Sequence, residues 1–185
     1  MIALMATKID KEDDIPPSEL RSFLSALPLS VAIVTAFDGH ERKAGVTVSS
    51  FTLVSLQPPI VAWCLKVTSY SRCIFEECST FAFNFLSDKQ EALCRHFAQG
   101  RNSDKFEGVP WQPGESGAPV FPNCAALMEC EKIGQQCIGD HVMFFGQTKF
   151  FRRTVQNNLV ALGPRLTSTI HFQRSTQRQR DACDS

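Results

Sequence analysis

Residues 45–59 read Gly-Val-Thr-Val-Ser-Ser-Phe-Thr-Leu-Val-Ser-Leu-Gln-Pro-Pro, which places small hydroxyl side chains in the middle of an otherwise apolar strand. The packing of a core seldom requires such residues there. They bring hydroxyl groups and a closely approachable backbone to one short segment. The residues that do so are Thr47, Ser49, Ser50, Thr52 and Ser55. The segment therefore predicts a strand edge that forms hydrogen bonds with a flat ligand bearing a polar rim.

The segments around this run predict a mainly β domain. Residues 30–37 are rich in β-forming side chains, Asp38-Gly39 is a strong hairpin turn, and residues 44–56 should form the antiparallel return strand. The other elements are expected as strands at 60–66, 80–86, 125–136 and 142–152 and as helices at 69–77 and 88–98. Hairpins and a few helical crossovers favour a small closed barrel over a doubly wound sheet. No Gly-x-Gly-x-x-Gly motif indicates a Rossmann site.

Three further features belong to this prediction. Leu20, Phe23, Leu24 and Leu27 recur at helical spacing after Pro16-Pro17, so one face of a first helix should pack on the domain. Asp88 is the expected N-cap of the helix at 88–98. Residues 99–123 hold four of the ten prolines and four of the ten glycines, and so long an excursion usually covers a site or an interface.

Length and composition indicate one domain. The chain has 185 residues, of which 43% are hydrophobic, enough to bury one core. We expect a tail at 1–15, the domain at 16–152 and a polar, poorly ordered C-terminal extension at 153–185. Nineteen basic and nineteen acidic side chains balance, so nothing favours nucleic acid or an acidic membrane surface. No apolar run is long enough to cross a bilayer and no signal-peptide pattern is present, so a cytoplasmic location is expected.

The sequence shows no motif typical of catalysis by side chains or by a bound metal. The eight cysteines lie in apolar or mixed segments without a Cys-x-x-Cys motif, so we interpret them as reduced thiols and expect no metal site. The four histidines are too scattered to suggest a triad. We therefore expect no catalytic side chain, and a bound cofactor that carries out the chemistry fits this pattern.

Several motifs, in order between residues 20 and 151, resemble the short-chain flavin reductases, the partner enzymes of two-component flavin monooxygenases. They are the run at 45–59, Asn84 within Phe-Ala-Phe-Asn-Phe, Arg95-His96-Phe97-Ala98, Asp104-Lys105-Phe106 and Gly139-Asp140-His141. His96 is an insertion into the family's Arg-Phe-Ala stretch. The resemblance implies a split β-barrel with short peripheral helices, usually a homodimer, that holds flavin in a groove.

The resemblance also assigns site residues. It implies that the first two strands and the basic residues near 69–105 contact flavin, and that the turn at Asp140 and His141 borders the nicotinamide. The implied flavin set is Val31, Val34, Thr35, Thr47, Val48, Ser49, Ser50, Phe51, Thr52, Ser69, Arg72, Asn84, Phe85, Arg95, Phe97 and Lys105.

Several of these residues have a plainer alternative interpretation. Ser69 could serve only as a helix cap, and Asn84 could be satisfied by backbone groups at a strand end. Arg95 and Lys105 could be ordinary surface charges. His141 could be an ordinary histidine beside a turn.

The function implied by the resemblance is reduction of diffusible FAD by NADH, with FMN and NADPH as alternatives, and delivery of reduced flavin by diffusion to a separate aromatic-hydroxylating oxygenase. Residues 157–165 lack the family's Tyr-His segment, which favours a second hypothesis, a flavin-binding carrier or sensor without turnover. A third hypothesis, an enzyme similar to pyridoxamine-phosphate oxidase, would require phosphate-binding arginines in the strands, and residues 43–66 contain none.

Overall fold

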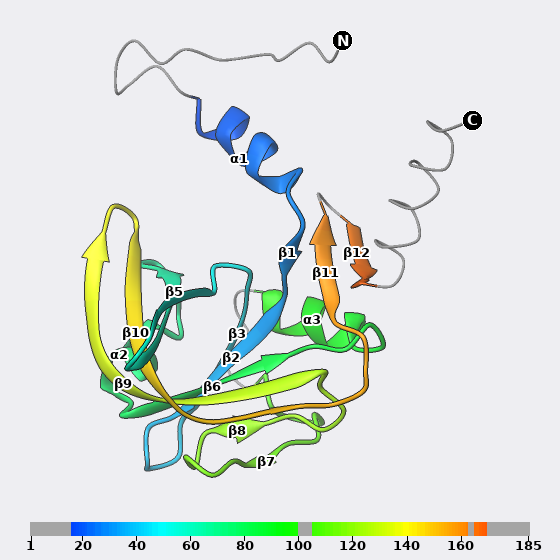
Figure 1. The fold of residues 1–185 in the computed structure, drawn as a ribbon. Coiled ribbons are helices and arrows are strands. Elements are labelled where there is room, and N and C mark those ends of the chain that lie inside the picture. Colours follow the sequence, from blue (N-terminus) through cyan, green and yellow to red (C-terminus); the bar gives the residue numbers. More distant parts are fainter. Residues whose placement is uncertain (1–15, 100–104, 163–164, 170–185) are drawn as a thin grey trace, which may run out of the picture.

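The computed structural model describes residues 16–99, 105–162 and 165–169. Its centre is a seven-stranded antiparallel sheet in the order β3-β2-β6-β9-β10-β5-β4, which curls into a split barrel (Figure 1). The strands of this sheet are β2 (Ala32–Phe37), β3 (Lys43–Val48), β4 (Thr52–Leu56), β5 (Pro59–Lys66), β6 (Thr80–Phe85), β9 (Ala126–Ile138) and β10 (His141–Arg153). The mainly β split barrel implied by the resemblance is confirmed.

Smaller elements surround the barrel. The three helices are α1 (Pro17–Ser25), α2 (Arg72–Glu77) and α3 (Glu91–Ala98). A second sheet contains β1 (Leu29–Ser30), β11 (Leu159–Leu162) and β12 (Arg165–Ser168), and a two-stranded ribbon contains β7 (Gln112–Pro113) and β8 (Pro119–Val120).

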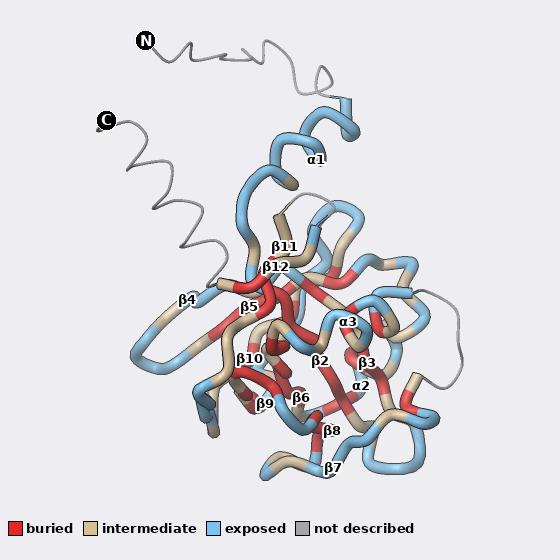
Figure 2. The backbone as a smooth tube through the Cα atoms, turned by 90° about the vertical axis from the view of Figure 1, so that its right-hand side faces the viewer, coloured by how far each residue is buried: buried red, intermediate tan, exposed pale blue. Residues whose placement is uncertain are grey.

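Aromatic side chains fill the inside of the barrel. Trp63 of β5 stacks on Phe144 of β10 with 4.9 Å between ring centroids. Phe75 of α2 packs edge-to-face against the Trp63 ring, with 4.8 Å between centroids. Phe81 and Phe83, alternate residues of β6, point into the same cluster and are fully buried. These rings account for the buried band that runs through the strands in Figure 2 and make this the main core.

Buried polar side chains attach the excursion after α3 to the barrel. Asn84 of β6 is fully buried, and its amide nitrogen donates to the Ile33 carbonyl (3.2 Å) and to Thr35 Oγ1 (3.1 Å). Its amide oxygen accepts the Phe121 N–H (2.8 Å). Glu129 of β9, 1% exposed, accepts the N–H (2.7 Å) and hydroxyl (2.6 Å) of Ser116. Each of these polar groups is satisfied inside the protein, so Ser116 and Phe121 are fixed against the sheet.

Most of the predicted strands are confirmed. β2 pairs antiparallel with β3 from Ala32↔Val48 to Phe37↔Lys43, as the Asp38-Gly39 turn indicates. The strands expected at 60–66, 80–86, 125–136 and 142–152 correspond to β5, β6, β9 and β10.

The single strand expected at 44–56 is wrong. β3 ends at Val48 and pairs with β2, whereas β4 begins at Thr52 and pairs with β5. Residues 49–51 carry the chain from one edge of the sheet to the other, and one regular strand cannot make that crossing. The crossing also leaves Leu53, Val54 and Leu56 of β4 more than half exposed.

Two helix predictions are corrected as well. Asp88 does not cap α3, because its carboxylate accepts a bond from the Asn157 amide (3.3 Å) and the helix begins only at Glu91 after Gln90. No residue of α1 is buried, and the helix stands away from the barrel (Figures 1 and 2). Its apolar face therefore packs on nothing within the described part of this chain.

The segment after residue 152 is only partly as expected. Residues 159–168 include β11 and β12, and β11 pairs with β1 at Leu29↔Ala161 and Ser30↔Val160. The strands β11 and β12 therefore lie where a poorly ordered segment was expected. The partner of β11, β1, comes before the first barrel strand in the sequence. Residues 170–185 lie outside the described residues. The division into a domain at 16–152 and an extension at 153–185 stays a prediction.

Candidate functional site

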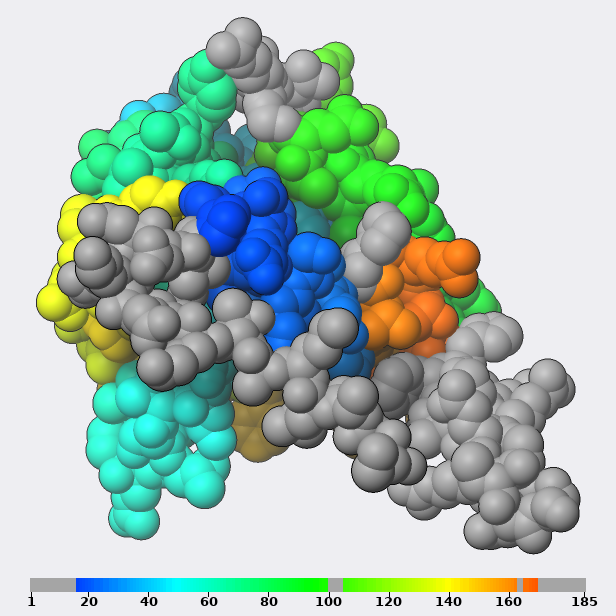
Figure 3. All heavy atoms as spheres, turned by 90° about the horizontal axis from the view of Figure 1, so that it is seen from above, coloured from blue at the N-terminus to red at the C-terminus, as the bar shows by residue number. Residues whose placement is uncertain are grey.

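A cleft of about 750 Å³ lies where the barrel is split. Residues 43–50, the end of α3 and Lys105-Phe106 form one wall, and Cys64–Lys66, residues 68–71, Ile74 and His141 form the other. In Figure 3 the blue-green atoms around α2 and the green atoms of α3 lie on opposite sides of a hollow.

Ser50 marks the closed end of the cleft. Its hydroxyl accepts the Cys64 N–H (3.0 Å) and donates to the Cys64 carbonyl (3.2 Å). The ladder of β4 and β5 reaches Thr52↔Ala62, so the Ser50 side chain replaces the next backbone pair. No ladder joins β3 and β5. The cleft is therefore the part of the barrel that the hydrogen-bonded sheet leaves open.

The other hydroxyl groups of the run have different surroundings. Thr47 Oγ1 donates to the Cys94 carbonyl (2.7 Å), which ties β3 to α3. Ser49 lines the cleft, is exposed, and forms no side-chain hydrogen bond with the described residues. Among the three hydroxyls at 47–50, only that of Ser49 can thus donate to a ligand without breaking a bond within the described residues.

Gly45 allows α3 to lie directly on β3. A Cβ atom at this position would fall 2.6 Å from Cδ1 of Phe97 and 3.3 Å from Cζ of Phe106. These two rings meet edge-to-face with centroids 5.3 Å apart, and both line the cleft. A glycine in the middle of β3 therefore gives the cleft an aromatic floor.

The charges around the cleft are positive. Lys43, Lys66 and Lys105 line it, and none of the described lining residues is Asp or Glu. Lys105 Nζ donates to the Phe97 carbonyl at the end of α3 (3.0 Å), and burial lowers the pKa of this lysine. Such a cleft attracts a ligand that carries phosphate.

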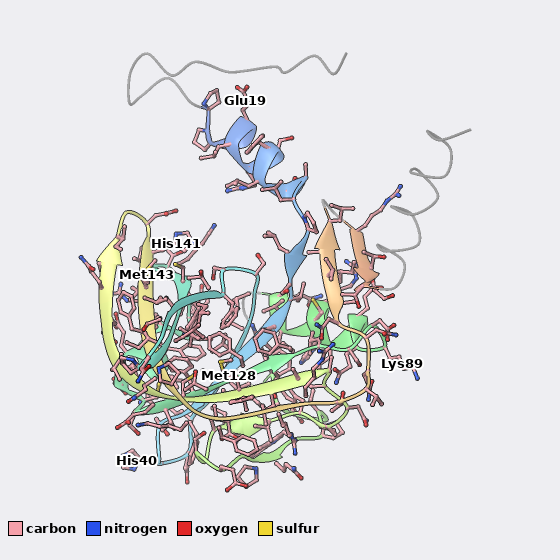
Figure 4. All side chains as sticks on the ribbon, viewed as in Figure 1. Glu19, His40, Lys89, Met128, His141 and Met143 are labelled. Carbon is pink, nitrogen blue, oxygen red and sulfur yellow. The ribbon has the colours of Figure 1, made fainter. Side chains whose placement is uncertain are left out.

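His141 lies at the start of β10, beside the β9–β10 turn (Figure 4). Its Nδ1 donates to the Asp140 carboxylate (2.7 Å), and this hydrogen bond lowers the pKa of Asp140. The imidazole is 35% exposed and the carboxylate 82% exposed. Asp140 thus orients the ring and leaves Nε2 available at the cleft.

The structure brings part of the expected set together. The residues of that set that line the cleft are Thr47, Val48, Ser49, Ser50, Ser69, Phe97, Lys105 and His141. Ser69 accepts the Ser71 N–H (3.3 Å) in the turn before α2, and Ser71 is the N-cap residue of that helix.

The rest of the expected set lies outside the cleft. Thr35 and Asn84 belong to the buried network that fixes the excursion, and Val31 and Val34 are buried in the core. Phe51 and Phe85 pack edge-to-face (5.2 Å) in the core, and Thr52 is exposed on β4.

The two arginines are held by carboxylates on their own helices. Arg72 pairs with Glu76 (2.7 Å) and Arg95 with Glu91 (2.6 Å). Neither arginine lines the cleft, and the expectation that they face a flavin phosphate stays a prediction.

Sequence reasoning missed several lining residues. Lys43 and Lys66 stand at the ends of β3 and β5 that border the split, and Phe106 follows the already noted Lys105. The neighbour relation to Lys105 could have indicated Phe106. Nothing in the local sequence of Lys43 and Lys66 shows that their two strands face each other.

The sequence pattern of the family described as flavin reductase like domain matches residues 24–162. This chain belongs to that family. In the part of the chain that the structure describes, no helix has the length and apolar character needed to cross a membrane.

Relatives with known names agree with this assignment. The NADH-dependent FAD reductase of Streptomyces globisporus is 34% identical over 151 residues, which cover 80% of this chain and 80% of that protein. The flavin reductase of Pseudomonas putida is 35% identical over 135 residues, which cover 73% of this chain and 79% of that protein. The chain spans only 64% of another relative, the stachydrine N-demethylase reductase subunit of Rhizobium meliloti, at 35% identity over 80% of this chain.

A solved structure has the same fold. It is the Streptomyces globisporus NADH:FAD oxidoreductase in complex with NAD and FAD fragments, which superposes with a TM-score of 0.77 at 32% identity. The match covers 88% of this chain and 96% of that one.

We expect Gly45→Ala to destabilise the protein by about 1–3 kcal/mol, because the added methyl group overlaps the Phe97 ring. Urea unfolding followed by circular dichroism measures the change. Gly134→Ala is the matched control, since its Cβ would meet only the Phe145 ring at 3.9 Å. Equal unfolding midpoints for the two variants would contradict the close contact of α3 with β3.

Proposed function

We propose that this protein is an NADH-dependent flavin reductase, which reduces diffusible FAD, or alternatively FMN, and releases it. The observation that carries the proposal is the cationic cleft at the split of the barrel, floored by aromatic rings and open along β3, in a chain of the flavin reductase-like family. When bound, flavin supplies the redox chemistry, since its N5 accepts a hydride from C4 of the nicotinamide.

The residues of the cleft fit such a ligand. The unpaired edge of β3 and the unengaged hydroxyl of Ser49 offer hydrogen bonds to the polar rim of a flat ring. Phe97 and Phe106, 0% and 5% exposed, form a buried floor that shapes the cleft from behind. The ammonium of Lys105 lies where a phosphate can approach. The protein's part is then to hold two rings at reacting distance and to exclude water, with no side chain required for proton transfer.

His141 is proposed to border the nicotinamide. It lines the wall opposite β3, and the bond to Asp140 restrains its ring. A restrained imidazole can position a carboxamide or ribose hydroxyl without contacting the flavin. Asp140 itself is exposed and acts through His141.

The reduced flavin is proposed to serve a separate aromatic-hydroxylating oxygenase by diffusion. Relatives named as reductase subunits of flavin-dependent monooxygenases support this, among them one from Rhodococcus jostii with 32% identity over 72% of this chain. The cytoplasmic location expected from the sequence stays a prediction.

The homodimer is also a proposal. Apolar side chains that nothing in the described chain covers occur on α1 (Leu20 46% exposed, Phe23 66%) and on β4 (Leu53 53%, Leu56 79%). Leaving such surfaces in water is unfavourable, and at roughly 25 cal/mol per Å² their burial against a second copy stabilises an assembly.

The first experiment tests turnover. Purified protein mixed with FAD and NADH should consume NADH, seen as loss of its nicotinamide absorbance, and the flavin should bleach under anaerobic conditions. Flavin binding without NADH consumption would instead support the carrier or sensor that the missing Tyr-His segment favours.

We expect His141→Ala to raise KM for NADH by roughly tenfold, about 1.4 kcal/mol, and to leave flavin affinity nearly unchanged, because the loss is confined to the nicotinamide. Steady-state kinetics with each substrate varied in turn measures both. Asp140→Asn is the milder companion variant, since it keeps a hydrogen-bond acceptor beside Nδ1. Equal damage to both substrates, or none, would make His141 a structural residue.

We expect the wild-type protein to be a dimer and Leu56→Glu or Phe23→Glu to shift it toward monomer, because each places a charge in the proposed interface. Light scattering after size exclusion reads the mass directly. Val155→Glu is the control, at a fully exposed residue outside α1 and β4. A monomeric wild-type protein at micromolar concentration would refute the interface.

A further inference from the structure

His96 holds the main chain at Lys105. Its Nε2 lies 2.8 Å from the Lys105 carbonyl oxygen, and because a carbonyl only accepts, the ring donates this bond from Nε2. Residues 100–104, which join the end of α3 to Lys105, lie outside the described part of the chain. The bond therefore ties Lys105 to α3 directly, whatever path those residues take.

The imidazole is itself held in place. It is half-buried on the last turn of α3, and it packs edge-to-face against the Phe97 ring with 5.2 Å between centroids. Phe97 is fully buried and lies against Gly45 of β3. Through His96, Lys105 is thus fixed to the barrel wall as well as to the helix.

The ammonium group of Lys105 is also restrained, yet it keeps unused donors. Nζ donates to the Phe97 carbonyl at the C-terminal end of α3 (3.0 Å), where the helix dipole favours a cation. An ammonium has three N–H donors, and this is its only bond among the described residues. No carboxylate of those residues pairs with it. Because Lys105 lines the cleft, two donors and a positive charge face an anionic ligand.

This double restraint makes the lysine a better anion-binding group. A lysine side chain has several rotatable bonds, and a ligand that fixes its ammonium must overcome the entropy of that freedom. Holding the main chain at residue 105 and the ammonium at the end of α3 removes much of the freedom before a ligand arrives. The affinity gained is confined to ligands that carry an anionic group for Lys105.

We propose that His96 is a positioning residue that aims Lys105 at the flavin phosphate and thereby makes the cleft select phosphorylated flavins over riboflavin. The inference rests on the proposed function, in which Lys105 approaches that phosphate. FMN and riboflavin share the ring and the ribityl chain and differ only by the phosphate, so a charge-assisted bond from the ammonium acts on FMN alone. His96 does not line the cleft and acts through Lys105.

The test compares FMN with riboflavin. Dissociation constants of the two oxidised flavins are measured by equilibrium dialysis for the wild type, His96→Ala, Lys105→Gln and the double variant. We expect the wild type to bind FMN about tenfold more tightly than riboflavin and Lys105→Gln to remove most of this preference. His96→Ala should weaken FMN roughly fivefold and riboflavin less than about twofold. In the Lys105→Gln background His96→Ala should have no further effect on FMN, because it acts through the ammonium.

Further variants distinguish the hydrogen bond from packing. His96→Gln keeps an amide N–H near the position of Nε2 and should recover most of the FMN affinity. His96→Asn has a side chain too short to reach the carbonyl and should behave like His96→Ala. His40→Ala and Lys89→Gln replace an exposed histidine and an exposed lysine that do not line the cleft, and both should leave the two constants unchanged.

The outcomes separate this role from the proposed function. Equal weakening of FMN and riboflavin by His96→Ala, or no change in either, would overturn the positioning role, while NADH consumption would still support flavin reduction. A preference for FMN that survives Lys105→Gln would overturn it too. A wild type that binds neither flavin would overturn both. If His96→Ala fails to fold, the comparison of His96→Gln with His96→Asn decides, since equal FMN affinities of these two variants would contradict the role of the bond.

Discussion

The bond between the Ser50 side chain and the backbone of Cys64 is the constraint on which the site depends. It is the last link between the two halves of the barrel at the point where the chain passes from β3 to β4. From Thr52 onward β4 is paired with β5, whereas no ladder joins β3 to β5. A hydroxyl can both donate and accept, so a serine replaces a full backbone pair at this position. The cleft is open because the sheet ends there.

The wall formed by β3, α3 and Phe106 depends on groups that do not line the cleft. Asn84, Thr35 and Glu129 are buried polar residues of the barrel, and each binds the backbone of the excursion. That attachment holds Phe121, on which Phe106 stacks, and Phe106 contributes to the floor of the cleft. An unsatisfied group in that network would cost roughly 1–3 kcal/mol, so the polar core and the site are parts of one structure.

The sequence predicted the positions of the strands better than it predicted which strands and residues they pair with. The strand β6, the turn between β2 and β3 and the long strands β9 and β10 follow from local patterns, and all are confirmed. The strand expected at 44–56 failed because hydroxyl-rich residues at 49–51 fit both a continuous strand and a crossing between edges. Asn84 was correctly singled out as a buried amide that needs partners. Those partners come from Ile33 and Thr35 on β2 and from Phe121, all far from Asn84 along the chain.

The sequence by itself determined the family and the β-rich barrel, because these depend on motifs and on period-two alternation within single strands. Of the site residues that it predicted, slightly fewer than half line the cleft. Only the tertiary structure decided which strand edges face each other. It thereby placed Lys43, Lys66 and Phe106 at the cleft and left Arg72 and Arg95 paired on their own helices. The physical reason is that side-chain direction follows from local backbone geometry, whereas the choice of neighbour follows from contacts between residues tens of positions apart.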